Sequence, residues 1–189
     1  MLDVCGHGVA AALISVSVSQ FLQNVPVPAG ESPTPGGILE ALNRAFPFER
    51  FDSYFSIVYM VIDPSAGTLS YSNAGHPPPL FIGEGGEARW LDRHGPVIGL
   101  SDDQAFTSET LRLDPADRIL VYTDGVLEME SENGGFFGKE RLSAAAEGAG
   151  EDARRIVDAV YDAAKEFGKN LQPEDDLSLL AVSFTGEGR

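Results

Sequence analysis

Three acidic stretches stand where an apolar run of the chain meets a turn, which is a suitable place to hold a cation. Asp3 precedes the glycine-flanked turn 5–8, Asp124 follows the apolar run 119–122, and the stretch 174–176 carries the third set of acids. Carboxylates that are brought together raise one another's pKa, so a convergent group of them needs either protons or a cation. We therefore predict that acids from the three stretches form one metal site.

The donor atoms in these stretches indicate which metal would bind. Carboxylate oxygens favour Mg²⁺ or Mn²⁺ over zinc, and the sequence has neither a Cys/His cluster nor a His-x-x-x-His pattern. Two such ions lower the pKa of a bridging water and hold a phosphate for in-line displacement. This chemistry needs no protein nucleophile, and the sequence has no Gly-x-Ser-x-Gly elbow and no evident base beside Cys5. The pattern predicts metal-assisted hydrolysis of a phosphate ester.

The charge balance limits the partners. With 13 basic and 29 acidic side chains, the net charge of the 189-residue chain is −16, which argues against nucleic acid as a ligand. The same acidity would repel a phosphorylated substrate unless divalent cations reversed the local field. A nuclease or phosphodiesterase with a similar acid cluster is disfavoured because the sequence shows no basic groove.

The cysteine count and the hydropathy predict a cytoplasmic protein. The single cysteine, Cys5, has no partner for an internal disulfide, and this favours a reducing compartment. We find no signal peptide and no apolar run long enough to span a bilayer, so no direct membrane insertion is expected. A chain of this length can bury roughly 70% of the surface its unfolded form exposes, which suits one domain.

Helical periodicity predicts four helices. The expected ranges are 9–25, 37–46, 139–146 and 152–167, with a surface linker over 25–37. The first helix, ended by Pro26 and Pro28, is expected to be buried or packed on a sheet, and it carries residues at spacings of three and four: Leu13, Val16, Ser17, Gln20 and Phe21. The last helix has a clearer apolar face: Ile156, Val157, Val160, Ala164 and Phe167.

The strands are predicted to pair as antiparallel hairpins. The expected ranges are 53–62, 68–73, 79–82, 88–91, 111–113, 118–122 and 177–184. The glycine-rich stretch 83–86 has a loose likeness to a phosphate loop, but no helix and no Lys-Ser/Thr pair follow it, so a hairpin turn is preferred. Because the strands follow one another as antiparallel hairpins rather than as βαβ units, the fold class predicted is layered α+β rather than a doubly wound sheet.

Six short motifs together resemble one known family. They occur in a fixed order over nearly the whole chain: DVCGHG at 3–8, NAGHPP at 73–78, GPVIGL at 95–100, YTDGVLE at 122–128, FGKERL at 137–142 and DDLSLL at 175–180. The set resembles the catalytic domain of the PPM class of metal-dependent serine/threonine phosphatases, in the bacterial SpoIIE-like branch of stress-response and sporulation signalling. The resemblance implies a single domain over 1–189, with two antiparallel sheets sandwiched between helices.

The resemblance also implies roles for particular residues. Asp3 would bridge two Mg²⁺ or Mn²⁺ ions, the backbone carbonyl of Val4 would be a further ligand, and Asp124 and Asp175 would complete the second ion's shell. Asp176 is the alternative to Asp175, since sequence alone does not separate adjacent acids. Hydroxide held by this binuclear centre would hydrolyse phosphoserine or phosphothreonine on a signalling protein, by family analogy an anti-sigma-factor antagonist.

Two histidines near these motifs have catalytic and structural readings. His7 could donate a proton to the leaving seryl oxygen or serve only to shape its turn. His76 lies between Gly75 and Pro77 in a tight connection, where a structural role is preferred.

The chain also departs from the family pattern. Family members carry a further acidic ligand upstream of the Asp3 motif, whereas this sequence starts two residues before Asp3. We therefore expect an N-terminally incomplete domain with weak or no phosphatase activity on its own, whose open sheet edges favour either a homodimer or completion by an upstream sensor or regulatory segment. Cys5 replaces the usual serine, a nearly isosteric change expected to be tolerated. The alternative function is a non-catalytic protein-interaction module with a degenerate metal site.

Overall fold

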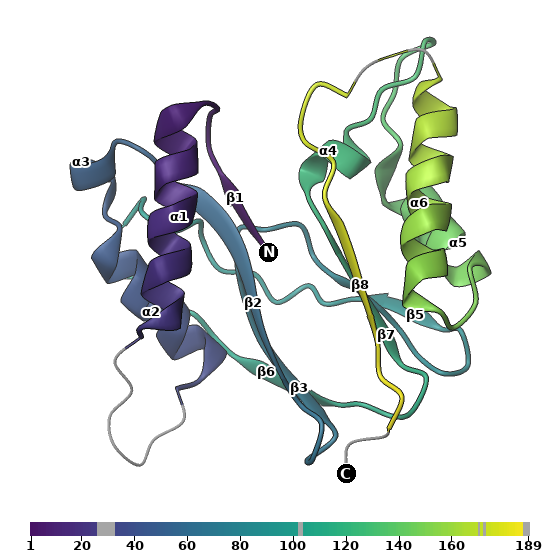
Figure 1. The fold of residues 1–189 in the computed structure, drawn as a ribbon, viewed down its shortest axis with the longest axis horizontal. Coiled ribbons are helices and arrows are strands. Elements are labelled where there is room, and N and C mark those ends of the chain that lie inside the picture. Colours follow the sequence, from purple (N-terminus) through teal and green to yellow (C-terminus); the bar gives the residue numbers. More distant parts are fainter. Residues whose placement is uncertain (26–32, 102–103, 170, 172, 187–189) are drawn as a thin grey trace. The chain divides into compact units, whose positions relative to one another are not determined.

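The computed structural model describes residues 1–25, 33–101, 104–169, 171 and 173–186. Within them the chain forms two compact units, the first from Met1–His76 with Arg93–Arg112 and the second from Pro77–Asp92 with Leu113–Arg189. Each unit combines one four-stranded antiparallel sheet with its own helices (Figure 1). The predicted α+β class with two antiparallel sheets is confirmed, while the prediction of a single domain over 1–189 stays a prediction.

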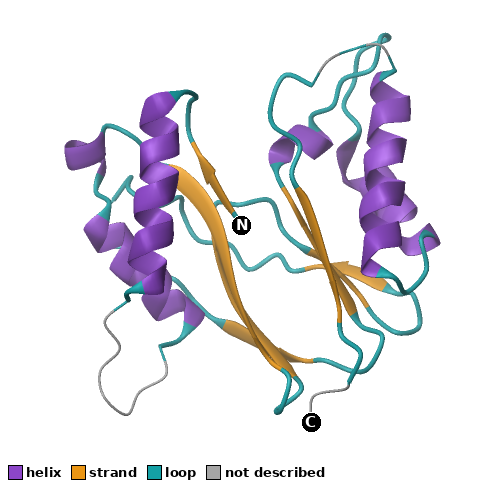
Figure 2. Ribbon diagram, viewed as in Figure 1, coloured by secondary structure: helices purple, strands orange, loops and turns teal. Residues whose placement is uncertain are grey.

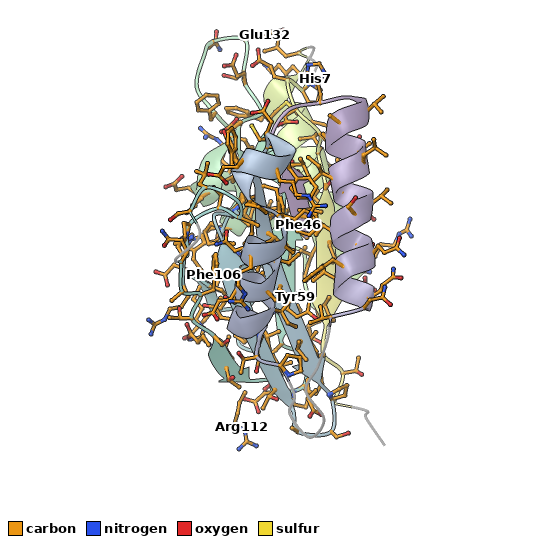
Figure 3. The ribbon with its side chains drawn as sticks, turned by 90° about the vertical axis from the view of Figure 1, so that its left-hand side faces the viewer. His7, Phe46, Tyr59, Phe106, Arg112 and Glu132 are labelled. Carbon is orange, nitrogen blue, oxygen red and sulfur yellow. The ribbon has the colours of Figure 1, made fainter. Side chains whose placement is uncertain are left out.

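The sheet of the first unit has the strand order β1-β2-β3-β6. Its strands are β1 (Leu2–Val4), β2 (Phe55–Asp63), β3 (Thr68–Ala74) and β6 (Glu109–Arg112), and its helices are α1 (Val9–Gln23), α2 (Pro35–Ala45) and the short α3 (Phe48–Phe51). The two longer helices pack on one face of this sheet (Figure 1). Figure 3 labels three aromatic side chains of the resulting core, Phe46, Tyr59 and Phe106.

The sheet of the second unit has the order β5-β4-β7-β8. Its strands are β4 (Leu80–Ile82), β5 (Ala88–Trp90), β7 (Arg118–Tyr122) and β8 (Leu179–Ser183), and its helices are α4 (Asp124–Leu127), α5 (Gly138–Gly148) and α6 (Ala153–Gly168). α6 packs against β8 and α5 (Figure 2). The stretch 83–86 joins β4 to β5 as a hairpin turn, which confirms that interpretation over a phosphate loop.

The first helix packs on a sheet, as expected, but the residues at helical spacing are not those that it buries. Leu13 and Val16 are 62% and 63% exposed, whereas Ile14 and Val18 are buried against the sheet. Alanine, valine and leucine lie on every side of this helix, so spacing alone did not identify the buried face. The helix ends at Gln23, and the part of the linker around Pro26 and Pro28 lies outside the described residues.

Two predicted helix boundaries shift for capping reasons. α2 begins at Pro35 rather than 37 because the hydroxyl of Thr34 accepts a hydrogen bond from the amide of Gly37 (3.2 Å) and proline suits the first helical position. α6 begins after Asp152, whose carboxylate accepts from the amides of Arg154 and Arg155. The apolar face predicted for α6 is confirmed, since Ile156, Val160 and Ala164 are buried. In the part of the chain that is described, no helix is both long and apolar enough to cross a bilayer.

Candidate metal centre

Asp3 is held on the edge strand of the first unit. β1 pairs antiparallel with β2 in a register that sets Asp3 opposite Ser56 and the buried Val4 opposite Phe55. The following turn contains Gly6 and Gly8, both with positive φ (91° and 87°), a conformation that L side chains adopt only with strain. α1 begins directly after this turn. The sequence therefore holds Asp3 within a paired strand that leads directly into a turn suited to glycine.

His7 and Cys5 lie in this turn and are exposed. A hydrogen bond with the Cys5 side chain raises the pKa of Tyr54, and the amide of Cys5 donates to the carbonyl of Tyr54 (3.0 Å). The thiol thus lies next to a tyrosine hydroxyl. The tolerance of cysteine at position 5 and the catalytic role of His7 stay predictions.

Asp124 stands at the end of the most buried strand of the second unit. All five residues of β7 are buried, and the hydroxyl of Tyr122 donates to the carbonyl of Pro78 (2.9 Å), while burial raises the pKa of Tyr122 above its usual value. α4 begins at Asp124 itself. Its Oδ1 is buried and, among the described residues, has no hydrogen-bond partner. A buried carboxylate oxygen in that state is costly unless something outside the described chain binds it.

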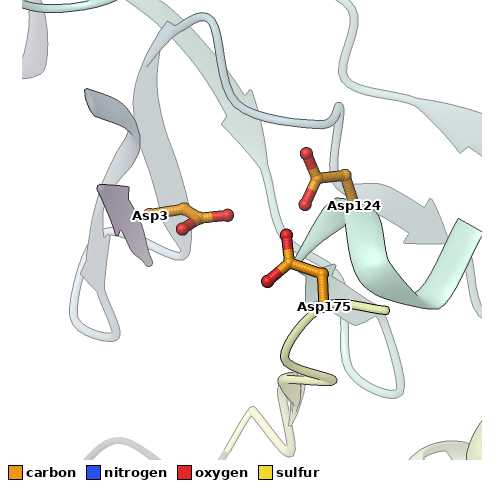
Figure 4. Close-up of side chains that lie close together, drawn as sticks. All are labelled: Asp3, Asp124 and Asp175. Atoms are coloured by element: carbon orange, nitrogen blue, oxygen red, sulfur yellow. The ribbon is translucent and has the colours of Figure 1, made fainter. Parts of the chain in front are cut away.

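Asp175 is brought next to Asp124 from far along the sequence. Their carboxylates offer oxygens within 4.8 Å of one another, and Figure 4 draws both side chains. Asp175 is exposed, and its Oδ1 accepts the amide of Asp176 (2.7 Å). Among the described acids, the group that contains Asp124 includes Asp175 and not Asp176. The geometry therefore favours Asp175 over its neighbour as the ligand.

A glycine allows this close approach. A Cβ built on Gly125 would lie 2.8 Å from the backbone oxygen of Asp176 and 3.3 Å from that of Asp175. No real side chain tolerates the first of these distances. The Asp-Gly pair at 124–125 is thus explained by packing: the acid is the candidate ligand, and the glycine makes room for the chain segment that carries the second acid.

Two asparagines hold loops of the first unit in place through hydrogen bonds to the backbone. This role was not predicted from the sequence. Asn73 bonds both ends of its amide to His76, donating to its carbonyl (2.9 Å) and accepting from its amide (2.8 Å). Asn43 does the same for the GPVIGL loop, donating to the carbonyl of Ser101 (2.6 Å) and accepting from the amide of Gly99 (2.9 Å). His76 is only 1% exposed in this arrangement, which agrees with its structural reading.

The described residues of the second unit fit a hard divalent cation. Both candidate donors are carboxylates, the donor type that Mg²⁺ and Mn²⁺ prefer. One of their oxygens is buried without a partner, and the second acid is exposed, so a hydrated ion can reach it. The pair can therefore bind one face of such an ion, with water completing the coordination.

The chain belongs to the family described as Stage II sporulation protein E (SpoIIE), whose model matches residues 1–185. It is 34% identical over 133 residues to the phosphoserine phosphatase RsbP of Bacillus subtilis, an alignment covering 68% of this chain and 32% of RsbP. It is 25% identical over 182 residues to the phosphoserine phosphatase RsbU of the same organism, covering 95% of this chain and 53% of RsbU. The chain thus spans about half or less of these curated relatives.

Solved structures share the fold. The SiaA-PP2C domain of Pseudomonas aeruginosa superposes with a TM-score of 0.76 at 20% identity, covering 97% of this chain and 74% of that one. The RsbU and RsbW domains of Rv1364c from Mycobacterium tuberculosis give 0.71 at 26% identity, covering 97% and 51%. These likenesses confirm the PP2C-type fold that the six motifs predicted.

Proposed function

We propose that this chain is the catalytic part of a protein phosphatase that hydrolyses phosphoserine or phosphothreonine on a signalling protein with the help of two divalent ions. The observation that carries the proposal is the buried, unpartnered Oδ1 of Asp124 with the Asp175 carboxylate within 4.8 Å. Family membership adds to it, because two relatives are phosphoserine phosphatases.

The proposed ligands are three carboxylates and one backbone carbonyl. Asp124 and Asp175 would hold one Mg²⁺ or Mn²⁺ ion, Asp3 would bridge it to a second ion, and the backbone carbonyl of Val4 would bind that second ion. Ions bound there would lower the pKa of coordinated water and offset the charge of the phosphate. The protein's own contribution is to fix the acids, to keep β7 dry behind them, and to supply negative charge that attracts the ions.

The substrate proposed is a small phosphorylated regulator of the anti-sigma-factor antagonist type. This choice of substrate rests on family analogy. RsbP and RsbU, which are 34% and 25% identical to this chain, are phosphoserine phosphatases. With a net charge of −16, the chain would approach such a phosphoprotein productively only when ions neutralise its acidic site. His7 is proposed to donate a proton to the leaving seryl oxygen, which then departs as a hydroxyl group.

Metal titration tests the proposal. Calorimetry with Mn²⁺ on the purified protein should show saturable binding that Asp124→Asn and Asp175→Asn weaken by at least about 100-fold, above the 10–100-fold typical of outer-shell partners. Asp176→Asn serves as the matched control, one position away on the same segment, and should keep wild-type affinity. Release of phosphate from a phosphoserine peptide, which is expected to be weak for this chain alone, should need Mn²⁺ and should be lost in the same two variants.

Other outcomes would overturn the assignment. Wild-type protein that folds but binds no Mn²⁺ would favour an interaction module without a working centre. A loss of binding in Asp176→Asn with normal binding in Asp175→Asn would exchange the two ligands. Binding of metal without any phosphate release would separate metal binding from catalysis.

A further inference from the structure

The hydroxyl of Thr123 joins the two chain segments that carry Asp124 and Asp175. It donates to the backbone carbonyl of Asp176 (2.8 Å) and accepts from the backbone amide of Ser178 (3.0 Å). The backbone amide of Thr123 also donates to the carbonyl of Ser178 (3.1 Å). Thr123 and Ser178 are 55 positions apart, so these bonds are tertiary contacts that fasten one loop to the end of β7.

This use of the hydroxyl is unusual for the position. Thr123 is the N-cap of α4, and a threonine there ordinarily accepts a hydrogen bond from an amide in the first turn of its own helix. Here the side chain makes no capping bond. The hydroxyl instead faces the segment 176–178 from a site that is only 6% exposed. The four-residue helix therefore has no side-chain cap, and the hydroxyl instead bonds the loop that carries Asp175.

We propose that Thr123 is a positioning residue for the metal ligands, an inference that rests on the proposed function. Thr123 directly precedes Asp124, and its bond to Asp176 lies directly after Asp175, so one hydroxyl sets the separation of the two acids. Outer-shell groups of this kind orient ligands, and their loss usually lowers metal affinity 10–100-fold. Thr123 thus sets the distance between the carboxylates of Asp124 and Asp175 and does not itself bind the ion.

Valine and serine substitutions separate the hydroxyl from the shape of the side chain. Thr123→Val keeps the volume and removes both side-chain hydrogen bonds, whereas Thr123→Ser keeps the hydroxyl. In Mn²⁺ calorimetry we expect Thr123→Val to lose about 10–100-fold in affinity and Thr123→Ser to stay within about threefold of wild type. Thr110→Val is the matched control: it removes an exposed hydroxyl that bonds Ser70 (2.8 Å) in the other unit and should leave Mn²⁺ affinity unchanged.

A second measurement uses the wild-type protein, in case Thr123→Val does not fold. Amide hydrogen exchange at Ser178 should slow when Mn²⁺ is added, because metal binding and the Thr123 contact stabilise the same loop position. Folded Thr123→Val with wild-type Mn²⁺ affinity, or Ser178 exchange that Mn²⁺ does not change, would overturn the positioning role. Wild-type protein that binds no Mn²⁺ would instead overturn the proposed function itself, so the two failures are distinguishable.

Discussion

Two buried asparagines of the first unit and Asp124 of the second unit differ in how completely their side-chain polar atoms are bonded. In the first unit, Asn43 and Asn73 are each 2% exposed, and both ends of each amide reach backbone partners. In the second unit, Asp124 keeps a buried oxygen for which no described residue supplies a donor. Buried polar groups that serve only the fold are normally satisfied within it. The asparagines therefore lock loops within the fold, whereas the oxygen of Asp124 that has no described donor supports the proposed role of Asp124 as a metal ligand.

The largest expected effect is that of Asp124→Asn, which should weaken metal binding without lowering the stability of the metal-free protein. Mn²⁺ affinity should fall by at least about 100-fold, while the free energy of unfolding in EDTA should stay equal or rise, because a buried unpaired charge is removed. Mn²⁺ calorimetry measures the affinity, and chemical denaturation in EDTA measures the free energy of unfolding of the metal-free protein. A clear loss of stability in EDTA would show that Asp124 is a structural residue instead.

Asn43→Ala should show the reverse pattern. It leaves the amide of Gly99 and the carbonyl of Ser101 without their partner, at a cost of about 2–4 kcal/mol in the free energy of unfolding. Its control is Asn24→Ala, because Asn24 also bonds a backbone carbonyl (2.8 Å) but does so at the exposed end of α1, where water replaces the bond. Urea denaturation of both variants would contradict the locking role if their losses were equal.

Gly125→Ala should act on both properties to a smaller degree. The added methyl group would meet the oxygen of Asp176 at 2.8 Å and push away the segment that carries Asp175, at a cost of about 1–3 kcal/mol and a lower Mn²⁺ affinity. Gly148→Ala at the end of α5 is the matched control, because nothing lies within 4 Å of its added Cβ. That variant should be neutral or gain up to about 1 kcal/mol.

The smallest expected effect concerns alkaline pH. Burial raises the pKa of Tyr122, so the folded state favours the neutral phenol. The stabilisation is complete below the ordinary tyrosine pKa of about 10 and is lost as the pH rises above it toward the folded-state value. Stability curves between pH 8 and 11 should therefore fall less steeply for Tyr122→Phe than for wild type. Curves of identical slope would mean that Tyr122 does not contribute to the alkaline loss.

Much of the fold could be predicted because its signals are local. α6 has a clear apolar face and a capping aspartate, and the strand pairs alternate with turn residues, so periodicity identified them. α1 is different: its apolar residues surround the helix, and only the sheet decides that Ile14 and Val18 are buried. The four-residue helices α3 and α4 are too short to give a periodic signal.

The candidate site divides in the same way. Asp124 could be found because an acid after the apolar run 119–122 has no simple structural explanation. Thr123 could not, since a threonine before Asp-Gly is equally well explained as a helix cap, and only the tertiary fold shows which bond it makes. Asn43 was missed because its partners lie 56 and 58 positions away, and one polar residue on an apolar helix face does not reveal them.

The pairing of β8 with β7 has a consequence for the order of folding. Tyr122 lies opposite Leu179 in this ladder, so the two acids of the second unit meet only after the last strand has joined a strand formed from the middle of the chain. Contacts between distant positions form later than local helices because they close longer loops. During refolding, we expect Mn²⁺ uptake to lag behind the helical signal of α6, so that the ion would report the moment at which the end of the chain docks.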